Sequence, residues 1–351
     1  MYEYLGQKVK VEKITTAADK PWGMAFLPNG SMLVTDRDGD LFLHNTNGQD
    51  IQIKNVPEVV ARGQGGLLDI EVHPDFENNH LIYLSYSKPN PEGEGQTTAI
   101  YQAILKDQEL IKGKDIFIAL PYLKTRHHYG SRMDFGPNGK LYFSVGDRGK
   151  RDDNPQFLDN ACGKIHRIND DGSIPADNPF VGQEGVVESI WSYGHRNPQG
   201  LVWDLEQGIL WTNEHGPRGG DEINSVEKGK NYGWPVISYG INYNGTTFTE
   251  ITEKEGMEQP NHYWIPSIGV CGMTIVKDEK YPAWKGYLLS GSLRFDYISM
   301  IKDQSDTVVD QEIKLLPNIG RLRSLSTDRE GYIYVGVEEP GRVYKILPVE
   351  D

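Results

Sequence analysis

A histidine and an aspartate near the middle of the chain are the first candidates for acid–base chemistry. His128 lies in the segment Thr125–Ser131, just before a predicted strand, and Asp147 ends the hairpin that follows. The ordinary pKa of histidine is close to neutral, so an imidazole here can accept a proton. A carboxylate at position 147 could hold one ring nitrogen and leave the other free, as in catalytic triads. The alternative is an exposed polar loop, the common setting of a lone histidine.

A second group of residues suits a metal ion. The segment Asn213–Asn224 (NEHGPRGGDEIN) contains three carboxylates, several glycines and a proline, and GKNYGWP follows at residues 229–235. Hard cations such as Ca²⁺ prefer carboxylate and backbone carbonyl oxygens. The composition therefore predicts a cation site, with an acidic surface loop as the alternative.

Arginines at two other places could bind an anion or polarise a carbonyl group. Arg321 and Arg323 are two residues apart in a predicted strand, so their side chains project from the same face. Two adjacent cations repel each other unless an anion with several carboxylates lies between them. Arg196 and Asn197 combine a planar cation with an amide, which suits carbonyl or carboxylate ligands. Ordinary surface positions are the alternative interpretation of both pairs.

These candidates lie beside a sequence pattern that recurs along the chain. Apolar residues alternate with polar ones, a turn such as Pro-Asn-Gly follows, and a second alternating run completes the pattern. Each copy predicts a β-hairpin, because period-two alternation marks a half-buried strand and the turn residues permit a tight connection. The copies begin at or near Trp22, Leu67, Arg132, Gly200, Met273 and Leu325.

Six hairpins about 45 to 70 residues apart match the repeat of propeller blades with inserted loops. We therefore expect one all-β domain over residues 1–351, a six-bladed β-propeller of four-stranded antiparallel blades. The first strand, Val9–Ile14, and the last, Gly341–Leu347, are predicted to share a blade and close the ring, which removes exposed sheet edges. The 39 glycines and 20 prolines agree with this fold, since helix interiors exclude both residues.

Charge and missing signatures exclude several function classes. The net charge of −14 argues against nucleic acid as a partner, because such binding requires a basic field, and against adhesion to anionic membranes. We expect no transmembrane segment and no secretory signal in this chain. The sequence also lacks a Walker loop, GxGxxG, HExxH and GxSxG, so phosphate-cradling and serine-hydrolase chemistry have no support.

Taken in order, the motifs resemble the soluble glucose/sorbosone (aldose) dehydrogenases that depend on pyrroloquinoline quinone (PQQ). The resemblance covers about Pro21–Leu347, nearly the whole chain. In this family the general base is a histidine that stands four residues before an arginine, and this arginine opens a strand that ends in Gly-Asp. The matching residues here are His128, Arg132 and Asp147. The resemblance implies that His128 takes the proton of the anomeric hydroxyl as hydride leaves for the quinone, and that Asp147 orients His128.

The resemblance also implies a set of contacts to the cofactor. Arg196 would polarise the quinone oxygen as negative charge develops on it. Arg321 and Arg323 would pair with the PQQ carboxylates. Arg294 stands where the family has a lysine, which keeps the charge but not the shape. The implied contacts are Gln64, His128, Arg196, Asn197, Arg294, Arg321 and Arg323.

Two calcium ions are implied as well. The first would lie between the cofactor and a loop, held by the backbone carbonyls of Gly216 and Pro217, and would act as a Lewis acid on the quinone. The second is structural in the family and would take a carboxylate from Glu222 and a carbonyl from Tyr232, with Asp221 nearby.

The resemblance thus implies PQQ- and calcium-dependent oxidation of an aldose at C1 to its lactone, with PQQ reoxidised by an external electron acceptor. His215 replaces a glutamine of the best-known glucose enzymes, and the chain is shorter than those dimers, which favours the compact aldose-dehydrogenase branch and a monomer. The family implies a location outside the cytoplasmic membrane: periplasmic, cell-surface or secreted.

Two other functions fit the same fold. A calcium-dependent lactonase would need carboxylate and asparagine ligands lining the channel, and would not need the pair Arg321 and Arg323. A binding propeller without catalysis would not need His128, Asp147 or Arg196.

Overall fold

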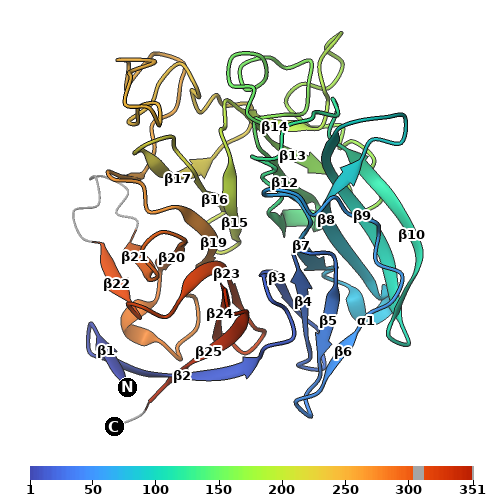
Figure 1. Cartoon of the computed structure of the whole chain (residues 1–351), viewed down its shortest axis with the longest axis vertical. Coiled ribbons are helices and arrows are strands. Elements are labelled where there is room, and N and C mark those ends of the chain that lie inside the picture. The colour runs from blue at the N-terminus through green and yellow to red at the C-terminus, as the bar shows by residue number, and fades with distance from the viewer. Residues whose placement is uncertain (303–311, 350–351) are drawn as a thin grey trace.

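The computed structural model describes residues 1–302 and 312–349. Six antiparallel sheets are arranged around a central axis (Figure 1). The predicted six-bladed β-propeller is therefore confirmed. Within these residues, helical structure is limited to three short segments, which are α1 (Phe76–Asn79) and the 3₁₀ turns η1 (Pro137–Gly139) and η2 (Pro282–Trp284).

The first strand of each blade lies nearest the axis. Each of these inner strands contacts the inner strand of the next blade, and the last contacts the first, so the ring is closed at its centre. The inner strands are β3 (Pro21–Phe26), β7 (Leu67–Val72), β11 (Met133–Phe135), β15 (Pro198–Asp204), β19 (Val270–Ile275) and β23 (Arg321–Thr327).

A second strand pairs with each inner strand to form the hairpin that the repeated pattern predicts. In the β11–β12 hairpin, Asn138 and Gly139 have φ values of 60° and 67°, which asparagine and glycine tolerate better than other residues. The second strands are β4 (Met32–Asp36), β8 (Leu81–Pro89), β12 (Leu141–Val145), β16 (Ile209–Glu214), β20 (Tyr287–Ser292) and β24 (Ile333–Glu338).

Two further strands complete each blade toward the outside. The third strands are β5 (Leu41–His44), β9 (Gln96–Lys106), β13 (Lys164–Ile168), β17 (Asp221–Val226), β21 (Ile298–Lys302) and β25 (Arg342–Pro348). The outer strands are β6 (Asp50–Gln52), β10 (Glu109–Ile118), β14 (Ile190–Tyr193), β18 (His262–Trp264), β22 (Ile313–Leu315) and β2 (Gln7–Thr15). The short β1 (Tyr2–Tyr4) adds a fifth strand to the blade that contains β2.

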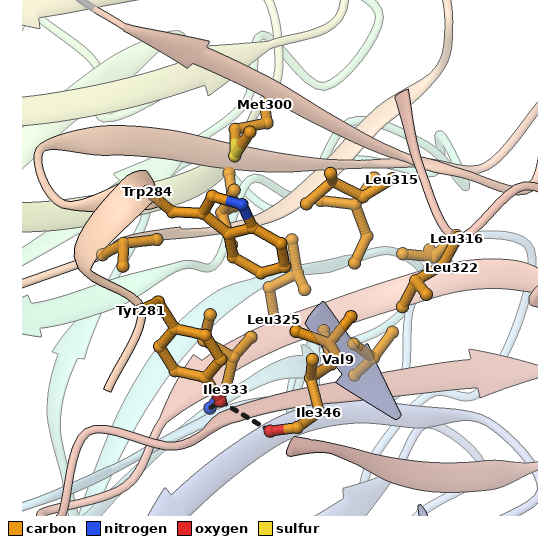
Figure 2. Close-up of a cluster of buried hydrophobic side chains, with 14 of the residues drawn as sticks. Val9, Tyr281, Trp284, Met300, Leu315, Leu316, Leu322, Leu325, Ile333 and Ile346 are labelled. Carbon is orange, nitrogen blue, oxygen red and sulfur yellow. Dashed lines mark hydrogen bonds between the residues drawn. The ribbon is translucent and has the colours of Figure 1, made fainter. Parts of the chain in front are cut away.

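The two ends of the chain close the ring in one blade, as the sequence predicts. Strand β2 pairs antiparallel with β25, with Val11 opposite Ile346 (Figure 1). The neighbouring core cluster contains Val9, Tyr281, Trp284, Ile333 and Ile346 among its buried residues (Figure 2). The Tyr281 hydroxyl donates a hydrogen bond to the Ile346 carbonyl at 2.5 Å, and the Trp284 indole donates to the Tyr4 carbonyl at 3.1 Å. The N-terminal strands are thus held by hydrophobic packing as well as by sheet pairing.

Cys162 and Cys271 are both buried and both free. Among the described residues, no helix combines the length and the apolar character needed to cross a membrane.

Replacing Trp284 by alanine should destabilise the closing blade. Trp284 is completely buried, so its removal leaves a cavity and leaves the Tyr4 carbonyl without its donor. We expect the free energy of unfolding to fall by about 3–5 kcal/mol. Chemical denaturation would measure this, with Leu205→Ala as the control because Leu205 is 60% exposed. A loss in Trp284→Ala no larger than in the control would show that this cluster does not stabilise the closure.

Candidate active site

The predicted site residues meet at one end of the channel because of how the hairpins run. Inner strands begin, and second strands end, at the same end of the ring. His128, Arg196 and Arg321 lie at or just before the starts of β11, β15 and β23. Asp147 follows the end of β12 and His215 follows the end of β16. Residues far apart in sequence are therefore brought together at one mouth of the propeller.

His128 and Asp147 form the hydrogen-bonded pair that the sequence predicts. The distance from His128 Nδ1 to Asp147 Oδ1 is 2.6 Å. The Asp147 carboxylate also accepts hydrogen bonds from the Gly149 amide at 2.7 Å and from the Trp234 indole at 2.8 Å. The backbone amide of His128 donates to Gln64 Oε1 at 2.7 Å. His128 is therefore fixed from both sides, while its Nε2 makes no hydrogen bond within the part of the chain that the structure describes.

The surroundings of His128 keep its ring neutral. Burial, followed by the charge of Arg196, lowers the pKa of His128 to about 4, although Asp147 acts in the opposite direction. Burial alone would raise the pKa of Asp147, but the hydrogen bond and charge of His128, with help from Arg196, lower it. At neutral pH the imidazole is thus uncharged beside a carboxylate. With Asp147 holding the proton on Nδ1, the lone pair on Nε2 is free to accept one.

Two adjoining cavities open at this mouth, and both are lined by Gln64 and Tyr243. The first, which we call the base cavity, has a volume of about 710 Å³. Its other lining residues include His128, Asp147, Arg151, Arg196, Pro217, Trp234 and Asn242. The second, the arginine cavity, has a volume of about 530 Å³. Its lining includes Trp22, Asn197, Gln199, His215, Arg294, Arg321, Arg323 and Glu338.

Arg196 reaches the base cavity from a buried position. Its backbone amide donates to the Glu214 carboxylate at 2.7 Å, and its guanidinium donates to the His215 carbonyl at 3.1 Å. The guanidinium carbon also lies 5.3 Å from the centre of the Trp234 ring. Its Nε is buried and has no hydrogen-bond partner among the described residues. A fixed cation with an unused donor suits an oxygen that becomes negatively charged during a reaction.

Arg321 and Arg323 converge as predicted, but a carboxylate of the protein already lies between them. Glu338 Oε1 is 2.8 Å from Arg321 Nε and 3.0 Å from an Arg323 terminal nitrogen. Burial opposes ionisation of Glu338, yet the two arginines lower its pKa below the usual value. The cluster keeps one net positive charge. Arg323 Nε is buried and has no hydrogen-bond partner within residues 1–302 and 312–349. Sequence analysis missed Glu338, although Arg321 pairs with it directly across β23 and β24.

The remaining predicted cofactor contacts occupy different kinds of position. Asn197 is buried, and its side-chain oxygen accepts the Gly130 amide at 3.0 Å, so it supports the segment that carries His128. Arg294 is exposed at the rim of the arginine cavity and donates to the Ser267 carbonyl at 3.2 Å.

The acidic loop after β16 is organised around Asp221. Its carboxylate accepts the backbone amides of Gly216 at 2.9 Å, Gly269 at 2.7 Å and Val270 at 3.1 Å. Asp221 therefore holds the loop that carries Gly216 and Pro217, in addition to any role toward a metal.

Glu222 lies in a different environment from Asp221. It is directly opposite Glu214 across β16 and β17, and both line a small cavity together with Gly216 and Tyr232. Burial and the charge of Glu214 raise the pKa of Glu222 well above its usual value. Within residues 1–302 and 312–349, no cluster of three or more His, Cys, Asp or Glu side chains is arranged to hold a metal ion. A cation here would depend on these two carboxylates and on backbone carbonyls.

A buried Ser–His–Glu chain lies behind Arg196 and was not expected from the sequence. His195 Nε2 is 2.8 Å from Ser192 Oγ, and His195 Nδ1 is 3.0 Å from Glu214 Oε1. This connectivity is that of a serine-hydrolase triad, but Ser192 and His195 are completely buried. Its role is to hold Glu214, which in turn fixes the backbone of Arg196. No signal in the sequence, such as GxSxG, indicates it.

Comparison with known proteins places these features in a family. The model of the family described as Glucose / Sorbosone dehydrogenase matches residues 18–345. The aldose sugar dehydrogenase YliI of Escherichia coli is 39% identical over 346 residues, which are 97% of this chain and 93% of that protein. Quinoprotein glucose dehydrogenase B of Acinetobacter calcoaceticus is 35% identical over 253 residues, 64% of this chain and 52% of that protein.

Solved structures agree with the sequence comparison. The apo form of the soluble aldose sugar dehydrogenase of Escherichia coli superimposes with a TM-score of 0.92 at 39% identity, covering 97% of this chain and all of that one. The PQQ-bound aldose sugar dehydrogenase of Streptomyces coelicolor gives a TM-score of 0.79 at 25% identity, covering 98% and 99% of the two chains. The family match extends over nearly the whole propeller, and the chain belongs to the glucose/sorbosone dehydrogenase family.

Proposed function

We propose that this protein oxidises an aldose at C1 to the lactone, with PQQ as the hydride acceptor and calcium as a second cofactor. The observation that carries the proposal is the free Nε2 of a neutral, buried His128 in a cavity that adjoins a second, arginine-lined cavity. A sugar in the base cavity and a planar anion in the arginine cavity would lie next to each other. An external acceptor, a monomeric state and a location outside the cytoplasmic membrane belong to the same proposal, on the basis of the family resemblance.

The residues of the arginine cavity fit PQQ. PQQ is an aromatic tricarboxylate, and it supplies an electrophilic quinone able to take up hydride. Arg323 has a buried Nε without a partner in the part of the chain that the structure describes, and Arg321 and Arg294 are exposed at the same cavity. Guanidinium groups bind carboxylates through paired hydrogen bonds. The Glu338 carboxylate would keep the two arginines in place before the cofactor arrives.

Each of these protein residues would then have a separate role in the oxidation of the sugar. His128 Nε2 accepts the proton of the C1 hydroxyl, which increases the electron density on C1 as hydride departs. Asp147 keeps the other ring nitrogen protonated and stabilises the imidazolium once it forms. The Arg196 guanidinium provides positive charge where negative charge develops. Trp234 and Gly149 hold Asp147 through their hydrogen bonds to its carboxylate.

The chain also offers donors that suit calcium. Two carboxylates, the buried Glu214 and the half-buried Glu222, face each other across neighbouring strands and repel. A divalent cation would relieve this repulsion, and carboxylate and carbonyl oxygens are the ligands that calcium prefers. We assign Glu222 and the Tyr232 carbonyl to a structural ion. The carbonyls of Gly216 and Pro217, on the loop held by Asp221, are assigned to an ion beside the cofactor.

Reconstitution tests the proposal directly. Purified apo-protein is given calcium, PQQ and a panel of aldoses with an artificial dye as electron acceptor. We expect dye bleaching only when calcium, PQQ and sugar are all present, because each supplies a different part of the reaction. Absence of PQQ binding by a folded protein would contradict the assignment.

The variant His128→Ala should lose turnover while it keeps PQQ binding. His128 is the proposed base, and general-base catalysis contributes about 10²–10⁴-fold to rate. His80→Asn is the matched control, because His80 is an exposed histidine in a turn with a φ of 54° and lies far along the chain from the site. Wild-type turnover in His128→Ala would remove His128 from the mechanism.

The pH dependence of the reaction should reflect the low pKa of His128. Only the neutral ring can act as base, so activity is lost as the pH falls through the pKa of about 4 rather than through the usual 6.5. We expect kcat/KM of the loaded enzyme to stay nearly constant from pH 7 to about 5 and to fall below that. A brief exposure to each pH followed by assay at pH 7 separates this effect from unfolding. An acidic limb centred near 6.5 would be inconsistent with the buried neutral imidazole.

Calcium should raise the melting temperature through Glu222. A ligand that binds only the native state stabilises that state by mass action. Addition of calcium to chelator-treated protein should therefore raise Tm by several degrees. Glu222→Gln removes the repulsion with Glu214, so this variant should be at least as stable as wild type without calcium and should respond less to it. The control is Glu227→Gln in the same segment, where the side chain is exposed. An undiminished calcium response in Glu222→Gln would exclude Glu222 as a ligand.

A further inference from the structure

Arg132 lies across the channel of the propeller and joins inner strands from several blades. It immediately precedes β11 and is only 6% exposed. Its Nε donates to the Gln199 carbonyl at 2.7 Å, and one terminal nitrogen donates to the Trp22 carbonyl at 2.9 Å and to Asp69 Oδ1 at 3.0 Å. The other terminal nitrogen donates to the Arg323 carbonyl at 2.9 Å. One guanidinium thus ties its own blade to four others.

The packing around this guanidinium is close on every side. Its central carbon lies 3.9 Å from the centre of the Trp22 ring. The second oxygen of Asp69 accepts the Met133 amide at 2.9 Å, so Asp69 joins both Arg132 and the start of β11. A Cβ added at Gly23 would lie 2.7 Å from Asp69 Oδ1, which shows how near β3 and β7 approach. The cation is therefore held in one position relative to these strands.

Three of the four residues that Arg132 binds, namely Trp22, Gln199 and Arg323, also line the arginine cavity. The fourth, Asp69, lines another cavity of about 640 Å³, as does Arg132 itself. Within the part of the chain that the structure describes, this cavity, which we call the opposite cavity, shares no lining residue with the arginine cavity. The guanidinium is thus part of the partition beneath the arginine cavity.

We propose that Arg132 is a positioning residue that builds the floor of the cofactor cavity. By binding three backbone carbonyls from different blades, it sets where the Trp22 ring and the Arg323 guanidinium lie relative to the bound cofactor. It does so without touching the cofactor. The inference rests on the proposed function, in which PQQ occupies the arginine cavity.

Loss of the guanidinium would act on cofactor binding through geometry. The carbonyls of Trp22, Gln199 and Arg323 would lose their shared donor, and the Asp69 carboxylate would be buried without its cation. The Trp22 ring would also lose the group on which it packs. Lysine restores the charge but cannot reproduce the planar set of donors that serves four acceptors at once. Both Arg132→Lys and Arg132→Met should therefore disturb the cavity floor.

The chain provides a matched control in Arg167. Arg167 is equally buried at 6% exposure, and it binds Asp177 at 2.9 Å and Asn178 at 3.2 Å. Its guanidinium carbon lies 5.0 Å from the centre of the Trp191 ring. It lies in β13, the third strand of its blade, and lines neither cavity at the mouth. Arg167→Met therefore removes an equally buried guanidinium and its hydrogen bonds at a place away from the cofactor.

The test measures PQQ affinity of folded apo-protein in saturating calcium, by quenching of tryptophan fluorescence, together with unfolding in denaturant. We expect Arg132→Met and Arg132→Lys to weaken PQQ binding by about tenfold or more, because a site held loosely loses affinity even when all its groups are present. Arg167→Met should lose stability but keep its PQQ affinity within about twofold of wild type. If Arg132→Met does not fold, the PQQ affinity of Arg132→Lys tests the proposal instead, because this variant keeps the positive charge opposite Asp69.

The outcomes separate this inference from the proposed function. Wild-type PQQ affinity in a folded Arg132 variant would overturn the positioning role and leave the proposed function intact. An equal loss of affinity in Arg167→Met would also overturn it, because the effect would then follow from stability alone. Failure of the folded wild-type protein to bind PQQ would overturn the proposed function and this inference with it.

Discussion

Closure of the ring by β2 and β25 is the constraint on which the rest of the structure depends. The hydrogen bonds between these strands join residues more than three hundred positions apart and place β23 beside β3. Only in a closed ring do six inner strands share one axis. Side chains from separate blades then lie together at one end of the central channel, which no single hairpin could bring about.

The chemistry at the mouth depends on how charge is arranged in a chain that is acidic overall. Carboxylates of the protein hold three of the arginines at this mouth. Glu214 accepts the backbone amide of Arg196, and Glu338 binds the guanidinium groups of Arg321 and Arg323. Burial and the charge of Arg196 lower the pKa of His128 and keep its ring neutral, although Asp147 is hydrogen-bonded to it. The site therefore presents an uncharged base next to fixed positive charge, which suits the removal of a proton from a hydroxyl group and of a hydride from the carbon that bears it.

Geometry alone does not identify a catalytic group, as two histidines in this protein show. His128 and His195 each bind a carboxylate through Nδ1. His195 also contacts a serine, in the manner of a hydrolase triad, but the whole arrangement is buried. His128 has its second nitrogen at a cavity. Access to a cavity separates the two, and the buried His195 supports Glu214 and Arg196 instead.

The sequence by itself determined the features that short-range order encodes. Alternation and turn residues predicted six hairpins, and the strands at the two ends predicted the closure. The pair His128 and Asp147 was also predictable, because both residues flank one hairpin and must emerge at the same end. Arg321 and Arg323 followed from the period of a single strand.

Contacts between blades were decided only by the tertiary structure. Trp234 on Asp147 and the four acceptors of Arg132 all come from segments of other blades that are remote in sequence. Their meeting depends on the angle between neighbouring blades and on the close approach of inner strands around the axis. Periodicity within a strand carries no information about that angle, since it reports which face of a strand is buried and not which other strand lies against it.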